Sequence, residues 1–503
     1  MEAKSIFRIK ELNISNFRCF SSYHIDMFGE ETTVLIGRNG AGKTTLLTAI
    51  VNALSFIFSK NRTIKQRYLS SGNPDLTIKN ISPLEIYTKN GITADDVEIS
   101  AKADFSDKVL EWKLYKRATN SALSPTLYND AYETFIKEVD NGKVILPIIV
   151  YFSDAFPHME GSIGPFAKKS LEQSSDLLKN FGYYQWDSRY SCTKLWELLF
   201  KNKWENLLFD QQNIFLNKIR LIYILNGLPE KVDVNQFISD PECIKQIQDK
   251  MDSSRYQELE NTINAIKQTE NNVSLRQKEI AFISDRIIKL CNLVAENEPD
   301  YTLTNISIQV HGDEKDVCFT FSSGKQLTIN QLPAGYQRII SIAFDIITRA
   351  LILNGCQVEP SGIVLIDEID LHLHPGLEKT VLSGFKKAFP EIQFIVTTHS
   401  AAVISNFKKD NKNIIISMCH LKEEYWNEVL PNVYGLNYDA TVRDAMGINN
   451  MPADIKVLES DYFNFVETGE DEKADKTLKM IQKLTGENSD VVQSILARVR
   501  LFK

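Results

Sequence analysis

The sequence predicts an α/β fold with a helical insertion and a helical C-terminal region. Three observations support this prediction. Continuous apolar runs of strand length occur in both halves of the chain, as is typical of buried parallel strands. One run leads into a glycine-rich loop. Between about residue 160 and residue 300, apolar side chains instead recur at helical spacing. The strand-like runs lie at 33–36, 144–152, 362–366, 394–398 and 414–418.

Length and composition limit the class of protein. The chain has 503 residues, 43% of them hydrophobic, which suits a globular protein of roughly two to four structural units. Its formal charge of −8 excludes the overall basic character of a nucleic-acid coat protein. From Leu421 to the end, 10 Lys and Arg face 15 Asp and Glu, so this segment alone carries −5.

The cysteines and the apolar segments indicate a compartment. The seven cysteines are scattered singly, which favours neither a disulfide framework nor a zinc site. The N-terminus lacks the apolar core of a signal peptide, and no run approaches the ~20 apolar residues of a membrane span. We therefore expect a cytoplasmic protein without a membrane contact.

The glycine-rich loop fits the phosphate-binding pattern GxxxxGK[ST] from Gly37 to Thr44, and a buried strand precedes it. Its main-chain N–H groups and the following helix N-terminus would face the phosphates of ATP. Lys43 would reach the β- and γ-phosphates, and Thr44 would hold Mg²⁺. The predicted nucleotide-binding residues of this loop are Arg38, Asn39, Gly40, Ala41, Gly42, Lys43, Thr44 and Thr45.

Two later strands end in polar groups that such a loop requires. The run 362–366 ends in Asp367 and Glu368, which is the Walker B pattern. We expect Asp367 to orient Mg²⁺ and Glu368 to polarise the attacking water. The run 394–398 is followed by His399, at the end of another buried strand. Glu368 is therefore a predicted catalytic residue.

Four motifs resemble those of ABC-type ATPases related to SMC and RecF proteins and occur in the same order. They are the P-loop, the segment 332–337, the Walker B acids and the strand end with His399. The opening 9–20 resembles their L.I.NFR.F segment, and the segment 332–337, LPAGYQ, stands where they have the LSGGQ signature. This resemblance implies an ABC-type P-loop ATPase head, in which Pro333, Ala334 and Gly335 contact the ATP of a second copy. It also implies that His399 is the switch histidine, which senses the γ-phosphate, and thus a second predicted catalytic residue. The chain would then form a homodimer or a higher homo-oligomer. The glutamine of the Q-loop has only a weak candidate, Gln185.

Pro333 departs from the family pattern, which has a serine there. Its ring cannot make the hydroxyl contact with the γ-phosphate, although proline is tolerated at the start of a helix and the helix N-terminus still offers N–H groups. The resemblance therefore implies weaker dimerisation and slow turnover. His372 and His374 raise the alternative of a metal site, which is less favoured because no third ligand lies nearby in the sequence.

The C-terminal region resembles one smaller group within these ATPases. It lacks the glutamate and DxD motifs of the nuclease that follows the ATPase in OLD-type proteins. Residues 461–467 and 474–486 instead resemble the C-terminal helices of PtuA-like ATPases of Septu anti-phage systems, which also occur beside some retron reverse transcriptases. That family implies regulation of a separate HNH nuclease. A retron reverse transcriptase and its nucleic acid are further implied partners.

Two other functions remain open at this point. One is a RecF-like DNA-repair ATPase that acts on DNA alone, and the other is a non-hydrolysing scaffold clamped by ATP. A basic run could contact DNA, but a run this short is more often a solvated helix face. It consists of Lys60, Arg62, Lys65 and Arg67.

The expected organisation has four parts: an N-terminal lobe with the P-loop (1–155), a helical insertion (156–300), a C-terminal lobe (301–420) and an acidic helical region for partner docking (421–503). In the insertion, we expect 241–297 to form a helical hairpin a few tens of ångströms long, too short for an SMC arm. An aromatic-rich apolar face is expected to be core. It comprises Trp186, Leu195, Trp196, Leu198, Leu199, Trp204, Leu207, Leu208 and Phe209.

Overall fold

A computed structural model describes most of the chain. The described residues are 7–59, 77–120, 122–141, 145–157, 179–187, 193–226, 234–239, 251–295, 302–311, 314–446, 452–487 and 489–502. The basic run at 60–67 lies outside these ranges. The described part divides into two compact units, Met1–Gly435 and Leu436–Lys503.

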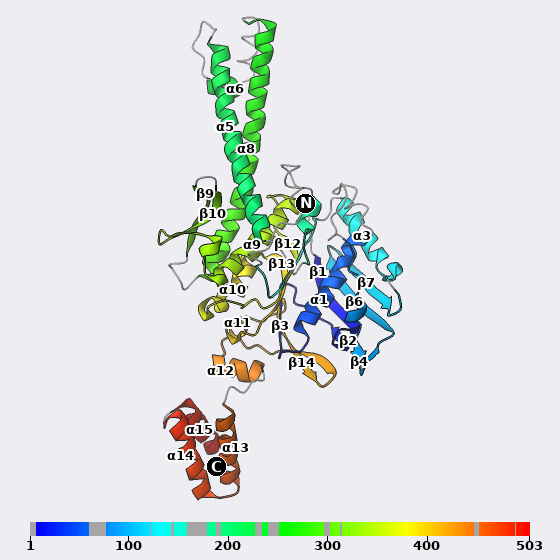
Figure 1. The fold of residues 1–503 in the computed structure, drawn as a ribbon, viewed down its shortest axis with the longest axis vertical. Helices are drawn as coiled ribbons and strands as arrows, with labels where there is room; N and C mark the ends of the chain where they lie inside the picture. Colours follow the sequence, from blue (N-terminus) through cyan, green and yellow to red (C-terminus); the bar gives the residue numbers. More distant parts are fainter. Residues whose placement is uncertain are drawn as a thin grey trace. The chain divides into compact units, whose positions relative to one another are not determined.

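A six-stranded sheet forms the centre of the first unit (Figure 1). Five of its strands are parallel, and their apolar side chains are almost all buried, as the continuous apolar runs predict. The α/β prediction is therefore confirmed. In spatial order the strands are β15 (Glu424–Val429, antiparallel), β14 (Asn413–Leu421), β3 (Thr32–Ile36), β13 (Glu391–Thr397), β12 (Ser361–Ile366) and β8 (Ile148–Phe152).

This strand order places the polar motifs together. β3, β13 and β12 are neighbours, and parallel strands end at the same edge of a sheet. The P-loop follows β3, His399 lies just beyond β13, and Asp367 follows β12. The carboxyl edge of the sheet therefore collects segments that are more than 300 residues apart in the sequence.

An antiparallel sheet lies beside the central one, in the order β2-β1-β6-β7. Strands near the N-terminus and a hairpin within 92–117 form it, with side chains that alternate between buried and more exposed positions. Helix α1 (Lys43–Leu54) packs on this sheet, where the indole N–H of Trp112 donates to the carbonyl of Ala53 at 2.9 Å. The strands are β1 (Phe7–Phe17), β2 (Phe20–Ile25), β6 (Asp96–Phe105) and β7 (Lys108–Arg117).

A buried amide joins the two sheets. Gln393 on β13 accepts from the main-chain N–H of Ile9 at 2.9 Å, and it donates to the carbonyls of Ile9 and Gly29 at 3.0 and 2.8 Å. Because an unpaired buried amide is costly, these three bonds fix β1 against the strand that ends next to the site.

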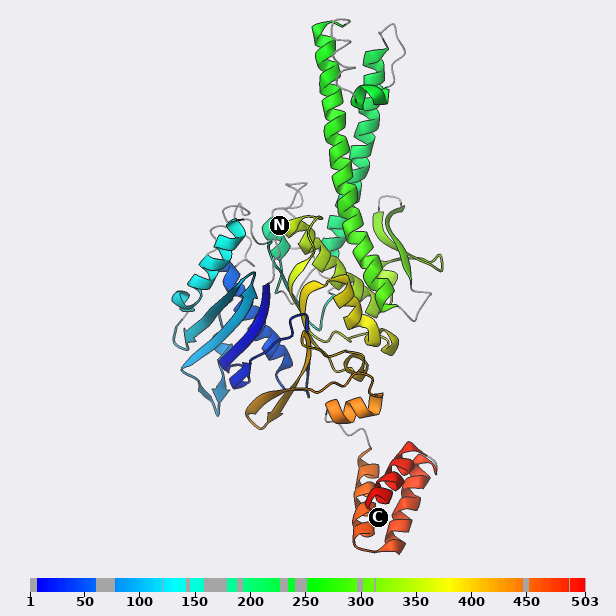
Figure 2. The ribbon, with the colours of Figure 1, turned by 180° about the vertical axis from the view of Figure 1, so that it is seen from behind.

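The C-terminal half of the first unit adds a small sheet and two helices. The sheet consists of β9 (Leu303–His311) and β10 (Glu314–Phe321), with β11 (Gln326–Thr328) on its edge. Helix α9 (Ala334–Asn354) starts at the signature-like motif, and α10 (Pro375–Ala388) follows the segment after Walker B. Figure 2 shows this half of the unit from behind, with β9 and β10 next to α8.

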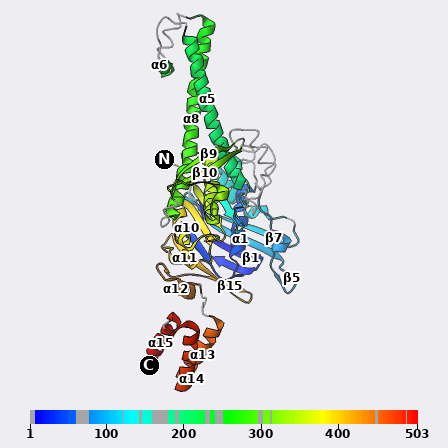
Figure 3. The ribbon, with the colours of Figure 1, turned by 60° about the vertical axis from the view of Figure 1, so that its left-hand side comes forward.

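Two long helices of the insertion form an arm. Helices α5 (Thr193–Leu225) and α8 (Ser253–Val294) run side by side in every view (Figures 1 and 3), and the end of α8 packs on α9 and α10. The expected hairpin within 241–297 is wrong, because residues 253–294 form one helix that pairs with α5. At ~1.5 Å per residue α8 is about 63 Å long, and the arm is longer than that segment could make alone.

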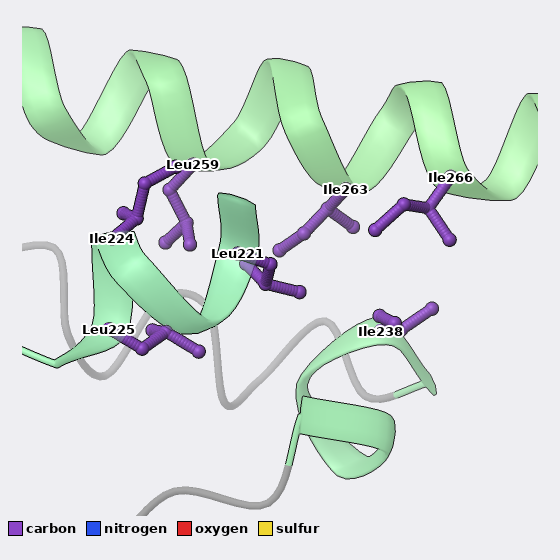
Figure 4. Packing of buried hydrophobic residues seen from close by; sticks show 7 residues of the cluster. All are labelled: Leu221, Ile224, Leu225, Ile238, Leu259, Ile263 and Ile266. Atoms are coloured by element: carbon purple, nitrogen blue, oxygen red, sulfur yellow. The ribbon is translucent and has the colours of Figure 1, made fainter. Parts of the chain in front are cut away.

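The arm has an apolar core of its own. Near its outer end, side chains from α5, α8 and the short helix α6 (Val234–Ser239) converge between the helices (Figure 4). Four ion pairs lie along the contact between the described parts of α5 and α8, among them Arg276 with Asp210 at 2.6 Å. The buried cluster contains Leu221, Ile224, Leu225, Ile238, Leu259, Ile263 and Ile266.

The expected core face of α5 is only partly buried. Trp196 and Leu199 pack against the head, and Trp196 stacks on Phe344 of α9 with ring centroids 4.1 Å apart. Leu208 and Phe209, in contrast, are 58% and 62% exposed, so their expected burial is wrong. They point away from α8, since the opposite side of α5 makes the contact with that helix.

The C-terminal region differs from the expected helical segment 421–503. β14 extends to Leu421 and pairs with β15, so residues up to Gly435 belong to the first unit. One further strand of the sheet therefore follows the apolar run at 414–418. The second unit packs α13 (Ala453–Glu467), α14 (Asp471–Thr485) and α15 (Asp490–Phe502) around Ile481, Val492 and Ile495.

The remaining described elements are short. None of the helices in the described ranges is long and apolar enough to cross a membrane. The short elements with strand or α-helical structure are β4 (Thr88–Lys89), β5 (Ile92–Thr93), α3 (Asn129–Asp140), α11 (Ala401–Ser405) and α12 (Tyr438–Ala440).

Candidate active site

The P-loop has the backbone that its glycines predict. Gly42, directly before α1, has φ of 90°, and a Cβ there would lie 2.5 Å from the ring of Phe20. Only glycine combines this left-handed conformation with so close a neighbour. The contact with the ring of Phe20, from the NFRCF segment, therefore helps to position the loop where the helix begins.

Lys43 is held within the loop. Its ammonium donates to the carbonyls of Gly37 at 2.8 Å and Arg38 at 3.3 Å, and the side chain is buried. Burial lowers the pKa of this ammonium, while the carboxylates of Asp367 and Glu368 act in the opposite direction. The cation therefore lies between the loop and the acids that end β12.

The Walker B aspartate is joined to the P-loop by one direct bond. The hydroxyl of Thr44 donates to Oδ2 of Asp367 at 2.9 Å across 323 positions of sequence. Thr397 at the end of β13 donates to Oδ1 at 2.6 Å, and Tyr151 on β8 lies 3.5 Å from Oδ2. Asp367 is buried, so these hydroxyls hold its carboxylate in one orientation.

Glu368 is positioned through its backbone. Its N–H donates to the hydroxyl of Thr397 at 2.7 Å, and its φ is 50°. A left-handed conformation is uncommon for a residue other than glycine and persists only where surrounding contacts impose it. The turn directs the chain away from β12 and leaves the side chain of Glu368 partly exposed beside the P-loop lysine.

Arg338, on α9, binds the backbone behind these acids. Its guanidinium is 1% exposed and donates to the carbonyls of Asp367 at 2.7 Å and Glu368 at 3.2 Å. It also donates to the carbonyls of Asp154 and Phe156, which follow β8. Burial lowers the pKa of Arg338, and the nearby carboxylate of Glu368 opposes this. One side chain thus ties the signature-like helix to Walker B and to β8.

The signature-like motif lies at the exposed start of α9. Pro333 is the N-cap residue, and both it and Ala334 are exposed. Gly335 packs so closely on the segment after Walker B that a Cβ there would lie 2.8 Å from the carbonyl of His372. A surface pocket of about 240 Å³ opens beside it, lined by Pro333, Ala334, Gly335, Tyr336, His372, His374 and Leu377.

Comparison with known families agrees with this geometry. A model of the AAA ATPase domain matches residues 8–404, which include the P-loop, Walker B and the histidine after β13. The chain belongs to the AAA ATPase domain family.

Relatives of this AAA ATPase come from two named systems. The Retron Vc95 probable ATPase of Vibrio cholerae serotype O1 biovar El Tor is 24% identical over 424 residues, which cover 81% of this chain and 73% of the relative. The Retron Ec83 probable ATPase of Escherichia coli is 23% identical over 429 residues, covering 80% and 70%. Septu protein PtuA of Bacillus mycoides (strain KBAB4) is 32% identical over 150 residues, covering 30% and 21%. The predicted relationship to retron and Septu ATPases is confirmed.

Solved structures similar to this AAA ATPase include heads of Smc proteins. The Smc head domain with an extended coiled coil from Pyrococcus furiosus has a TM-score of 0.42 and 15% identity, and the match covers 84% of this chain and 96% of that one. The SMC head domain from Thermotoga maritima has a TM-score of 0.39 and 10% identity, with coverage of 84% and 99%.

The predicted site residues of this AAA ATPase form two groups. The P-loop residues, Asp367 and Glu368 lie together, and His399 follows β13 with an exposed side chain at the same edge. Pro333, Ala334 and Gly335 lie instead beside the segment after Walker B. Gln185 lies in a segment next to β8, where the carbonyl of Trp186 accepts from the N–H of Tyr151 at 2.8 Å. Their functions stay predictions.

Three residues of the site were missed. Thr397 and Tyr151 orient Asp367, and Arg338 holds the backbone of both acids. Thr397 stands in the motif that ends β13, so its position could have suggested a role. In the described part of the chain, no group of three or more His, Cys, Asp or Glu residues is arranged to hold a metal ion. His372 and His374 therefore gain no third ligand there.

Proposed function

We propose that the chain binds and hydrolyses ATP with Mg²⁺. The bond between Thr44 and Asp367 is the observation that carries this proposal, because it brings a P-loop hydroxyl and a Walker B carboxylate to one point. Mg²⁺ prefers oxygen ligands, keeps several waters and takes few protein ligands, which suits this pair. The ion would neutralise charge on the phosphates when bound.

The residues around that point divide the work of hydrolysis. Lys43 exchanges its two loop carbonyls for phosphate oxygens. Glu368, beside the P-loop and free of the bonds that hold Asp367, orients the attacking water and accepts its proton. His399 contacts the γ-phosphate from the end of β13.

A second copy completes the site in this proposal. The exposed start of α9 presents main-chain N–H groups and the positive end of a 21-residue helix. Pro333 contributes no hydroxyl, so the nucleotide-bound homodimer is held less tightly than one with serine at this position. Turnover is slow as a consequence, since assembly limits the formation of the complete site.

Substitution of Pro333 by Ser is expected to strengthen ATP-dependent self-association by about tenfold, through one added hydrogen bond to a charged phosphate. Folding should be unchanged, because the residue is exposed and serine is a better N-cap than proline. Sedimentation velocity with Mg²⁺ and ATP measures the effect. Pro333→Ala is the control, and equal association of the two variants would remove the proposed phosphate contact.

The similarity to retron and Septu ATPases supports a proposal for the cellular role of this chain. We propose that the chain is the cytoplasmic ATPase of an anti-phage defence system, and that it controls a separate HNH nuclease. Its C-terminal unit provides the docking surface, since α14 begins with Asp471 and Glu472 and presents a charged exterior. In a retron, the reverse transcriptase and its nucleic acid would join the same assembly.

Co-expression with an HNH protein encoded beside it tests this role. The full-length chain should retain the nuclease on purification and hydrolyse ATP, and nucleotide should alter cleavage of DNA by the complex. If the two proteins do not purify together while the chain still hydrolyses ATP, only the proposed nuclease partnership is overturned. Salt-dependent binding of duplex DNA by the chain alone would instead favour the DNA-repair function.

A further inference from the structure

The arm carries a second apolar face on α5 that the described structure leaves uncovered. Its large side chains are between 46% and 79% exposed, although the buried face of the same helix already packs on α8 and α6 (Figure 4). A contiguous exposed apolar patch of this kind marks an interaction surface. We call it the outer stripe. It consists of Leu208, Phe209, Phe215, Leu216, Ile219, Ile222 and Tyr223, with Gln212 as its polar member.

The spacing of the outer stripe fits a helical partner. One edge is Leu208, Phe215 and Ile222, and the other edge is the residue after each of these, so both repeat every seven residues. Gln212 and Ile219 lie between the edges at the same interval. A seven-residue repeat of apolar side chains is the pattern that packs against another α-helix in a left-handed supercoil. The stripe is about 22 Å long at ~1.5 Å per residue.

The stripe is self-complementary for two copies that run in opposite directions. In such a pair, each edge of one helix lies along the same edge of the other. The first edge is symmetric about Phe215, the second about Leu216, and the centre about the point between them. A single two-fold axis between Phe215 and Leu216 lies within one residue of all three centres. It therefore pairs every part of the stripe with its own counterpart, as a closed symmetric dimer requires. Gln212 of each copy then faces Ile219 of the other.

The charges that flank the stripe are balanced within one copy. Lys218 lies beyond the first edge and 3.6 Å from Glu270 of α8, and Arg220 lies beyond the second edge and 2.6 Å from Glu258. These ion pairs favour neither direction, so the symmetry of the apolar stripe carries the antiparallel arrangement.

We propose that two copies of this chain associate through antiparallel packing of their α5 outer stripes. This contact is separate from the nucleotide-dependent contact at the signature-like helix, and it forms without nucleotide. A chain with both contacts can assemble beyond a dimer, since each copy then has two different self-associating surfaces.

Sedimentation of the full-length protein in nucleotide-free buffer tests the contact. The wild type should associate reversibly, and the double variant F215E/L216E should weaken this association by about a hundredfold or more, because carboxylates from both copies meet at the apolar axis. The matched control is Leu275→Glu. Leu275 is 50% exposed on α8 and points away from α5, so its variant should associate like the wild type.

Both variants change exposed side chains, so unaltered thermal unfolding should accompany either result. A monomeric wild type without nucleotide, or undiminished association of F215E/L216E, overturns the proposal. Nucleotide-dependent association could persist in either case, so failure here is distinguishable from failure of the proposed ATPase dimer.

Cross-linking decides the direction. A mixture of Gln212→Cys and Ile219→Cys chains should form a disulfide between unlike chains under mild oxidation. The wild type, with its seven native cysteines, gives the background. Disulfides between two Gln212→Cys chains would show parallel packing and overturn the antiparallel arrangement.

Discussion

Replacement of Glu368 by Gln is expected to lower ATP turnover by about a hundredfold to ten-thousandfold, the usual contribution of a positioned general base. Binding of ATP should stay within about twofold of the wild type, since Glu368 makes none of the bonds that hold the P-loop to Asp367. Its backbone contact with Thr397 is kept, and glutamine can adopt the same φ of 50°. Phosphate release under saturating ATP and equilibrium binding of a fluorescent ATP analogue measure the two quantities.

Glu391→Gln is the matched control for this variant. Glu391 begins β13 at the opposite edge of the sheet and lies 3.8 Å from Arg8, in an ion pair that is partly exposed. The same chemical change there should leave turnover unaltered, because exposed pairs contribute little. Phosphate release at the wild-type rate by the Glu368 variant would show that another group activates the water.

The variant Arg338→Met is expected to affect both stability and turnover. It removes one donor from each carbonyl that the guanidinium binds, and we expect a loss of about 3 kcal/mol in unfolding free energy after the gain from removing a buried cation. Turnover should fall by about tenfold to a hundredfold, since Glu368 loses one of the contacts that fix its backbone.

Separate measurements distinguish these two effects of Arg338. Denaturant unfolding gives the stability, and kcat measured well below the unfolding transition gives the positioning effect. Arg338→Lys should restore part of the stability but little of the kcat, because one ammonium cannot bind both the carbonyls after β8 and those of Walker B. A normal kcat in the folded Met variant would make Arg338 a purely structural residue.

The sequence predicted those parts of the site that depend on local pattern. The P-loop glycines and the acids after β12 have fixed spacing, and their apolar strands are buried on both faces. Arg338 was missed because its partners are main-chain carbonyls, which leave no signal in a sequence. β15 was missed because Glu424 and Glu428 make it unlike a buried strand, and it lies at the edge of the sheet.

The arm shows that apolar periodicity alone does not predict which side of a helix is buried. α5 is apolar on two sides, and spacing alone does not tell which side meets α8. Leu208 and Phe209 were therefore expected in the core, whereas Leu221 and Ile224 occupy it. The pairing of α5 with α8 was equally hidden, because facing residues such as Asp210 and Arg276 are 66 positions apart in the sequence.

The length of α8 has a mechanical consequence. Its C-terminal end rests on α9 and α10, the helices that follow the signature-like motif and Walker B. Over about 63 Å, a rotation of ~5° at that end moves the far end by about 5 Å. An arm of this length would convert a small tilt at the nucleotide site into a displacement large enough for distance measurements between labels at its tip.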